Sequence, residues 1–314
     1  MPFSIYDSIF QMKLISSLHP ILHDRSISLL RQFSVTTLAQ LLTLKPEKLC
    51  SILSLPFSTI TQLRMELFRE NSSFAVVGLE LYQAGLEEEV HVDTGSMSLD
   101  KVVGGLQGGL VYEVFGCSGS GKTELCMSAA AACAGGGGGC VYADSKEDFC
   151  PVRFADVLAR KGGDMLAMHR VQVVSVTTHK ALLTAVTRVV EEMENIKLLV
   201  VDNITFPMMS LVGNNAVQTA FATGCKVGHL LHKLAKNQGA VVMVVSNLKG
   251  GVGENMPALG GIWGRLADVR LYMEQVGEEE RVVRVVRGRG VGGECKVRIG
   301  DRGIIDCKQV ESGT

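Results

Sequence analysis

Eight consecutive residues have the composition and spacing of a loop that binds phosphate groups. These residues are Gly116, Cys117, Ser118, Gly119, Ser120, Gly121, Lys122 and Thr123. They fit the pattern G-x-x-x-x-G-K-[ST], and they lie between an apolar strand candidate at residues 110–115 and a helical stretch at residues 123–134, as the pattern requires. Glycines let the backbone wrap closely, so that successive N–H groups and the helix N-terminus face the phosphates. We therefore expect a nucleoside triphosphate, ATP, to bind in this loop.

Two oxygen-bearing side chains are expected to hold Mg²⁺ beside the loop. In this pattern Lys122 reaches the β- and γ-phosphates, and the Thr123 hydroxyl is a ligand of Mg²⁺. The apolar segment at residues 197–202 is predicted to be a buried strand that ends in Asp202. An acidic residue at the carboxyl end of such a strand lies beside the phosphate loop and binds the ion or its water. The sequence thus predicts ATP and Mg²⁺ as ligands, with Thr123 and Asp202 as the metal-binding pair.

The overall composition narrows the class of protein. The chain has 314 residues with 31 basic and 32 acidic side chains, and this balance argues against a protein that coats nucleic acid through bulk positive charge. Its nine cysteines contain no C-x-x-C pair, so we expect reduced, mostly buried thiols and no zinc site. The first residues lack the pattern of a secretory signal, and no stretch reaches the roughly 18 apolar residues that a membrane span needs. We expect a soluble, intracellular protein.

The sequence divides into three parts. Residues 1–70 show apolar residues at helical spacing, broken at Pro46 and Pro56, and are predicted to form a small all-α domain of helical hairpins. Residues 71–93 are predicted to be a linker that ends in an acidic run. Two interpretations of its apolar segment, residues 74–77, stay open: a solvated spacer, or a strand that adds to the sheet edge of a neighbouring subunit. Residues 94–314 form the third part.

Apolar strands alternate with helices in this third part. The strand candidates are residues 110–115, 140–143, 171–176, 197–202, 240–246 and 269–273, and the helical stretches are residues 123–134, 149–161, 180–194 and 218–238. The alternation predicts an α/β fold with a mostly parallel sheet that helices cover on both faces. Residues 281–306 contain shorter strands and many glycines, which favours antiparallel hairpins at the end of the sheet.

Several motifs around the phosphate loop resemble the RecA/RadA family of recombinases. They are TGSMSLD at residues 94–100, GGLVYE at 108–113, VYADS at 141–145, VVD at 200–202, VSN at 245–247, PALG at 257–260 and RIGDRGIID at 298–306. The N-terminal helical part also looks like the small domain that precedes this core in eukaryotic and archaeal members. The resemblance implies a RecA-like P-loop ATPase core. Among subfamilies, the sequence is most similar to the D-type paralogues of the eukaryotic strand-exchange recombinase.

Two positions depart from the hydrolysing members of that family. Those members place a Glu two residues after a strand-ending Asp to position the attacking water, whereas here Asp144 is followed two residues later by Lys146. A charged Lys cannot accept a proton from water, and Glu147, one residue further on, is expected to point elsewhere. We expect Lys146 either to clamp the γ-phosphate or to lie in solvent. The family also senses the γ-phosphate with a Gln at the end of a polar triplet, where this chain has Leu248.

The expected contacts with DNA are few. Residues 206–215 correspond to the first DNA loop of the family and contain no Arg or Lys, although phosphate binding relies on those residues. The second loop corresponds to residues 248–264 and contains Lys249, with Arg265 just beyond it, so these two are the candidate DNA contacts. Trp263 is expected to be buried against the sheet or to stack on a base.

Basic residues also gather near the C-terminus. They are Arg281, Arg284, Arg287, Arg289, Lys296 and Arg298. A spacing of three does not keep residues on one face of a strand. We interpret them as a solvated hairpin rim, with contact to DNA or to a neighbour's phosphates as the alternative.

The resemblance and the departures lead to one expected function. We expect an ATP-binding paralogue that acts as a subunit of a hetero-oligomeric complex for homologous recombination and double-strand break repair, with weak ATPase activity and binding of single-stranded DNA. The resemblance implies other recombinase paralogues and the strand-exchange recombinase as partners, and a location in the nucleus. The alternatives are a self-sufficient DNA-dependent ATPase that exchanges strands alone, and a hexameric helicase or clock-type ATPase on the same core.

Overall fold

The computed structural model describes residues 13–71, 79, 90–212, 217–248, 265–288 and 292–307. The chain divides into two compact units, Met1–Glu87 and Glu88–Thr314, and each is described by itself. Within the described residues, no helix has the length and apolar character needed to cross a membrane.

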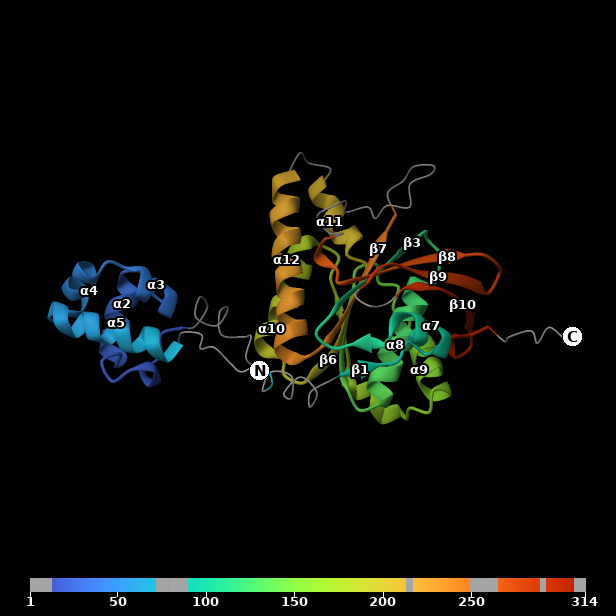
Figure 1. Ribbon diagram of the computed structural model, residues 1–314, viewed down its shortest axis with the longest axis horizontal. Helices are drawn as coiled ribbons and strands as arrows, with labels where there is room; N and C mark the ends of the chain where they lie inside the picture. The colour runs from blue at the N-terminus through green and yellow to red at the C-terminus, as the bar shows by residue number, and fades with distance from the viewer. Residues whose placement is uncertain are drawn as a thin grey trace, which may run out of the picture. The chain divides into compact units, whose positions relative to one another are not determined.

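The first unit is a bundle of short helices (blue in Figure 1). Its elements are η1 Ser16–Leu18, α2 Asp24–Gln32, α3 Leu38–Thr43, α4 Pro46–Leu53 and α5 Phe57–Asn71. Thr37 and Gln40 form a capping box at the start of α3, and Pro46 begins α4 at a position where its missing N–H leaves no bond unmade. The helices share one apolar core that includes Leu22, Ile27, Leu30, Leu38, Leu41, Leu49, Ile60, Leu63 and Leu67.

The second unit is built on one large sheet. Among the described residues, nine strands form it in the order β11-β10-β9-β8-β3-β7-β6-β4-β5. Their bounds are β3 Val111–Gly116, β4 Gly139–Asp144, β5 Val171–Ser175, β6 Ile196–Asp202, β7 Val241–Asn247, β8 Val269–Gln275, β9 Glu280–Arg287, β10 Gly293–Gly300 and β11 Gly303–Asp306. The strands from β8 to β5 pair in parallel, whereas β8, β9, β10 and β11 pair antiparallel. A separate pair joins β1 His91–Val92 to β2 Leu106–Gln107.

Helices cover both faces of the sheet, which confirms the predicted α/β fold class (Figure 1). The helices of this unit are α7 Met97–Val103, α8 Lys122–Gly135, α9 Pro151–Arg160, η2 Met165–Arg170, α10 His179–Glu192, α11 Thr205–Val212 and α12 Val217–Gln238. Side chains of α8 and α9 pack with one set of strand residues, and side chains of α10 and α12 pack with the alternate set. On β3, for example, Val114 faces the α8 side and Val111 faces the α12 side, as the two-residue repeat of a strand requires.

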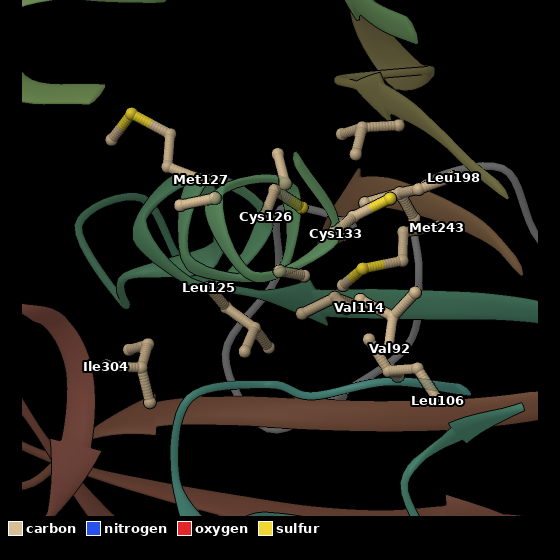
Figure 2. Packing of buried hydrophobic residues seen from close by; sticks show 14 of the residues in the cluster. Val92, Leu106, Val114, Leu125, Cys126, Met127, Cys133, Leu198, Met243 and Ile304 are labelled. Atoms are coloured by element: carbon tan, nitrogen blue, oxygen red, sulfur yellow. The ribbon is translucent and has the colours of Figure 1, made fainter. Parts of the chain in front are cut away.

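Helix α8 is the element that positions the phosphate loop, because it begins inside that loop. Its side chains are small, and Cys126, Ala129, Ala130 and Ala134 are all buried. Small side chains let the helix approach the sheet closely, and Figure 2 shows its residues in one cluster with Val114 and with Met243 of β7. This close packing against the sheet fixes the position of the N-terminus of α8 relative to the strand ends.

The segment expected as the first DNA loop is instead largely helical. Residues 206–212 belong to α11, and residues 213–215 of the predicted loop lie outside the described residues. The Asn203 side chain accepts a hydrogen bond of 2.7 Å from the backbone N–H of Thr205, which opens the helix, and Met208 is buried in the core beside α12. The apolar residues that make this segment poor in DNA contacts are therefore the ones that stabilise it as a helix.

The two ends of the core meet. At the end of β11, the Asp306 carboxylate accepts hydrogen bonds from the Ser96 and Ser98 hydroxyls and from the Ser98 backbone N–H, at the start of α7. The first and last of the motifs used for the family resemblance thus form one structural feature.

The cysteines differ in part from the expectation. None of the nine forms a disulfide. Only Cys126, Cys133 and Cys140 are buried, whereas Cys117 and Cys150 are exposed. The expectation that most are buried is wrong because the other six lie on loops and at partly covered positions.

Candidate functional site

The predicted phosphate loop connects the central strand β3 to α8. Gly116 ends β3, and Gly121 is the N-cap of α8 with φ +95°, a left-handed conformation that glycine adopts without strain. A Cβ atom on Gly116 would lie 2.1 Å from the carbonyl oxygen of Met273 on β8, so no other residue fits there. At the tip, Cys117 and Ser118 are exposed and Ser120 is buried. The glycines of the motif are thus required by backbone conformation and by close approach to β8.

Lys122 lies inside the loop and is buried. Its Nζ donates hydrogen bonds to the carbonyl oxygens of Gly116 at 2.9 Å and Cys117 at 2.6 Å, and to Ser120 Oγ at 3.3 Å. Burial lowers the pKa of Lys122, the carboxylate of Asp202 opposes this shift, and the charge of Lys146 adds to it. A buried ammonium that is held only by neutral oxygens gains strength from an anionic partner. Phosphate oxygens have this character.

Thr123 and Asp202, the predicted metal-binding pair, are brought together. Asp202 ends β6 and is buried, and the Tyr142 hydroxyl donates a 2.9 Å hydrogen bond to its Oδ2. Burial raises the pKa of Asp202, and its hydrogen bonds with Thr123 and Tyr142 oppose this shift. A carboxylate and a hydroxyl in contact form the kind of oxygen donor set that Mg²⁺ prefers. The residues present therefore fit the predicted ion.

A polar cluster that sequence reasoning missed joins the neighbouring strand ends. Asn203 donates through its backbone N–H to Ser145 Oγ at 2.8 Å and through Nδ2 to Asn247 Oδ1 at 2.8 Å. The backbone N–H of Asn247 in turn donates to Thr205 Oγ1 at 3.1 Å. These residues follow or end β4, β6 and β7, whose carboxyl ends lie at one edge of the sheet. The signal in the sequence was a polar residue directly after each buried strand.

The turn after β4 carries Lys146 at the position where the family resemblance led us to expect a base. The Asp144 carboxylate accepts hydrogen bonds from the backbone N–H groups of Lys146, Glu147 and Phe149 at 3.1, 3.0 and 2.8 Å, so it holds the turn. Glu147 accepts a 3.4 Å hydrogen bond from Ser175 on β5, away from the phosphate loop, as expected. Lys146 is exposed, and its charge lowers the pKa of both Lys122 and Asp202. It therefore lies within electrostatic range of the site.

A buried charge pair supports the strand that leads into the loop. Glu113 on β3 has no exposed surface, and its carboxylate accepts 2.6 Å hydrogen bonds from Arg270 Nε on β8 and from Ser246 Oγ on β7. The Arg270 guanidinium also lies 5.0 Å from the centre of the Phe115 ring. Ser246 is the first residue of the polar triplet, so this triplet is tied to β3 through Glu113. In the sequence, Glu113 was visible only as the last residue of the motif at 108–113, with no role of its own.

Of the two candidate DNA contacts, only Arg265 lies within the described residues. Lys249 and Trp263 lie outside the described residues. Arg265 is exposed just before β8, and its neighbour Leu266 packs against Gly228 of α12. Leu266 thus packs on the α12 side of the sheet, opposite the side that α8 covers. Its role as a DNA contact stays a prediction.

The expected solvated rim near the C-terminus is wrong for Arg281, and Arg289 lies outside the described residues. Arg287 and Lys296 are exposed, as expected. The Arg284 side chain is 46% exposed and pairs with Glu294 at 2.8 Å, and Arg298 pairs with Glu279 at 3.6 Å. Arg281 is only 7% exposed, because the turn between β8 and β9 and the phosphate loop enclose its guanidinium. The alternation of side chains between the two faces of β9 did not reveal the burial of Arg281. This burial comes from a loop more than 150 residues away in the sequence.

The fold and this loop define a phosphate-loop α/β protein of the RecA-like class. A model of the Rad51 family matches residues 86–307, which is more than half of the chain. The chain belongs to the Rad51 family. This result confirms the resemblance that the motifs indicated.

Individual relatives agree with this assignment. The chain is 27% identical over 275 residues to DNA repair protein RAD51 homolog 4 of Mus musculus, an alignment that covers 82% of this chain and 83% of that protein. It is 26% identical over 218 residues to DNA repair and recombination protein RadB of Thermoplasma acidophilum, which covers 68% and 93%. It is 28% identical over 244 residues to DNA repair protein RAD51 homolog 1 of Arabidopsis thaliana, which covers 71% of each.

The raised pKa of Asp202 leads to a prediction about acid sensitivity. Mg²⁺ binding needs the carboxylate, and a raised pKa means that protonation begins at a higher pH than for an ordinary aspartate. The advantage of Mg·ATP over metal-free ATP is therefore expected to shrink on acidification in the wild type. In Asp202→Asn, the advantage of Mg·ATP over metal-free ATP at neutral pH is expected to fall by about tenfold or more. It should also no longer decrease on acidification, because the titrating carboxylate is absent.

The measurement is a titration with a fluorescent ATP analogue, with and without Mg²⁺, between pH 5 and 8. Titration of the nucleotide itself is common to both proteins and cancels in the comparison. The exposed Asp156 provides the control, and Asp156→Asn should follow the wild type. An unchanged Mg²⁺ dependence in Asp202→Asn would remove Asp202 from the metal site.

Proposed function

We propose that this protein binds Mg·ATP and acts in homologous recombination and DNA repair as a subunit of a hetero-oligomeric complex of recombinase paralogues in the nucleus. Its phosphate loop holds the triphosphate, with Lys122 on the β- and γ-phosphates and Thr123 and Asp202 on the metal. The bound Mg²⁺ neutralises phosphate charge. The names of the two relatives, a DNA repair protein and a DNA repair and recombination protein, support the biological role.

One observation carries the proposal that the nucleotide is held rather than rapidly hydrolysed. The loop, Lys122 and the Thr123–Asp202 pair are complete, yet Lys146 occupies the position of the base and Glu147 faces β5. A nucleotide that binds only the folded, assembled state favours that state by mass action. ATP therefore stabilises the complex more than it drives a cycle, with weak turnover and with single-stranded DNA as a partner of the assembly.

The sheet offers an edge on which a neighbouring subunit can assemble. Strand β5 is the last strand on its side of the sheet, and Val173 on it is 48% exposed. An edge strand presents N–H and C=O groups that an extended segment of another chain can pair with. The apolar segment at residues 74–77, which lies outside the described residues, has the composition for such a strand. In this proposal one paralogue contributes the strand and its neighbour contributes an edge such as β5.

The second candidate function is a self-sufficient strand-exchange recombinase, favoured by the similarity to RAD51 homolog 1. The two functions predict different ATP turnover by the pure full-length protein. The scaffold function predicts slow turnover that single-stranded DNA raises little. Rapid, DNA-stimulated turnover that is lost in Lys122→Ala would establish the recombinase function and contradict the scaffold function.

A further inference from the structure

The phosphate loop rests on the antiparallel strands at the end of the chain. Strands β8, β9 and β10 follow β3 in the sheet (Figure 1). A Cβ atom on Gly116 would meet the Met273 carbonyl of β8, and one on Gly121 would lie 2.5 Å from Cδ1 of Ile299 on β10. The loop therefore has two points of direct support, one on each side of β9.

Between these two points, Arg281 of β9 reaches the tip of the loop. Its NH2 group donates a hydrogen bond to the carbonyl oxygen of Gly119 at 3.4 Å. Its NH1 group shares its two N–H donors among the carbonyls of Gly277 and Glu278, in the turn between β8 and β9, and of Glu280 at the start of β9, at 3.0 to 3.2 Å. One side chain thus joins this turn to the most exposed part of the phosphate loop.

The charge of Arg281 has no carboxylate partner among the described residues. Its hydrogen bonds to the described residues all end on backbone carbonyls, and its Nε is buried without a partner among them. Arg284 and Arg298 in the same hairpins pair with Glu294 and Glu279. A buried charge without a counter-ion is costly for the folded protein, and a nearby anion offsets that cost. The arrangement is unfavourable without ligand and favourable beside a polyphosphate.

We propose that Arg281 is a positioning residue of the nucleotide site. It holds the Gly119 carbonyl toward the C-terminal strands, which leaves the N–H groups of the loop to face the phosphates, and it places an unneutralised positive charge behind the loop. This inference rests on the proposed binding of ATP. Residues 281 and 119 are 162 positions apart, so the site extends beyond the contiguous motif into the C-terminal hairpins.

The test compares Arg281→Met, Arg281→Lys and Arg284→Met in the full chain. A fluorescent ATP analogue measures affinity, and thermal melting measures stability with and without nucleotide. Arg281→Met is expected to bind at least tenfold more weakly and to show a smaller stabilisation by nucleotide. Its melting temperature without nucleotide should equal or exceed that of the wild type, because methionine removes an unpaired buried charge. Arg281→Lys, which keeps the charge but cannot bridge the turn and the loop, should be intermediate.

The control and the two Arg281 variants together distinguish a role in nucleotide binding from a purely structural role. Arg284→Met removes a paired, exposed arginine and should bind like the wild type. A purely structural role would lower the melting temperature of Arg281→Met and leave its affinity within about twofold, which overturns the inference. If Arg281→Met does not fold, the Arg281→Lys variant decides instead: an affinity for the analogue equal to that of the wild type would overturn the inference. Failure of the wild type to bind the analogue would instead contradict the proposed function itself.

Discussion

Lys122→Ala is expected to weaken Mg·ATP binding by about a hundredfold or more. The Nζ of Lys122 is buried and makes three hydrogen bonds within the loop, all to neutral oxygens. Transfer of this ammonium to phosphate oxygens replaces neutral partners with charged ones, and charge-assisted hydrogen bonds contribute about 1.5–3 kcal/mol each. Two such bonds correspond to roughly a hundredfold to ten-thousandfold in affinity.

The measurement is equilibrium titration of the full chain with a fluorescent ATP analogue. Lys101 is an exposed lysine on α7, and Lys101→Ala should bind like the wild type. Circular dichroism should show that Lys122→Ala keeps its fold, because the rest of α8 remains buried. Binding within a few fold of the wild type would show that the nucleotide does not depend on this loop.

The same variant tests whether nucleotide has a structural role in assembly. If ATP stabilises the complex, co-purification of Lys122→Ala with a paralogue partner should fall in parallel with its ATP affinity. If Lys122→Ala lost ATP binding but co-purified with the partner as the wild type does, ATP would have no structural role in assembly.

Lys146→Glu is expected to raise ATP turnover at least tenfold above the wild-type rate. Lys146 is exposed at the end of β4, in a turn that the Asp144 carboxylate holds through the backbone N–H groups of Lys146 and Glu147. Because the backbone is held in this way, the substitution changes the side chain without releasing the turn. A positioned general base contributes about a hundredfold to ten-thousandfold to a reaction, so partial alignment is enough for a measurable gain.

Two controls separate the base from the change in charge. Lys146→Gln removes the positive charge without supplying a base and should stay near the wild-type rate. Addition of Lys122→Ala to Lys146→Glu should abolish the gain. Equal turnover in the Glu and Gln variants would assign the effect to charge alone, and no gain in either would show that position 146 is not aligned with the attacking water. Steady-state phosphate release by the full-length protein measures all of these rates.

The phosphate loop and the α/β class followed from local patterns. Eight contiguous residues carry the whole loop motif, and apolar runs separated by helices define parallel strands whatever their order in the sheet. Asp202 was also predicted, because the carboxyl ends of parallel strands lie at one edge. The domain bounds 1–70, 71–93 and 94–314 stay a prediction beside the two compact units of the structure.

The features that sequence patterns missed depend on contacts between distant residues. Arg281 is buried because a loop at position 119 folds against β9, and Glu113 is paired because β3 lies between β7 and β8. Residues 206–212 form a helix because Met208 finds a core beside α12. A motif whose residues are adjacent in the chain is visible in the sequence, whereas the surroundings of a buried charge depend on strand order and on loop packing. For this protein, therefore, the residues expected to contact phosphate were evident from the sequence, and the residues that support them became evident only in the folded chain.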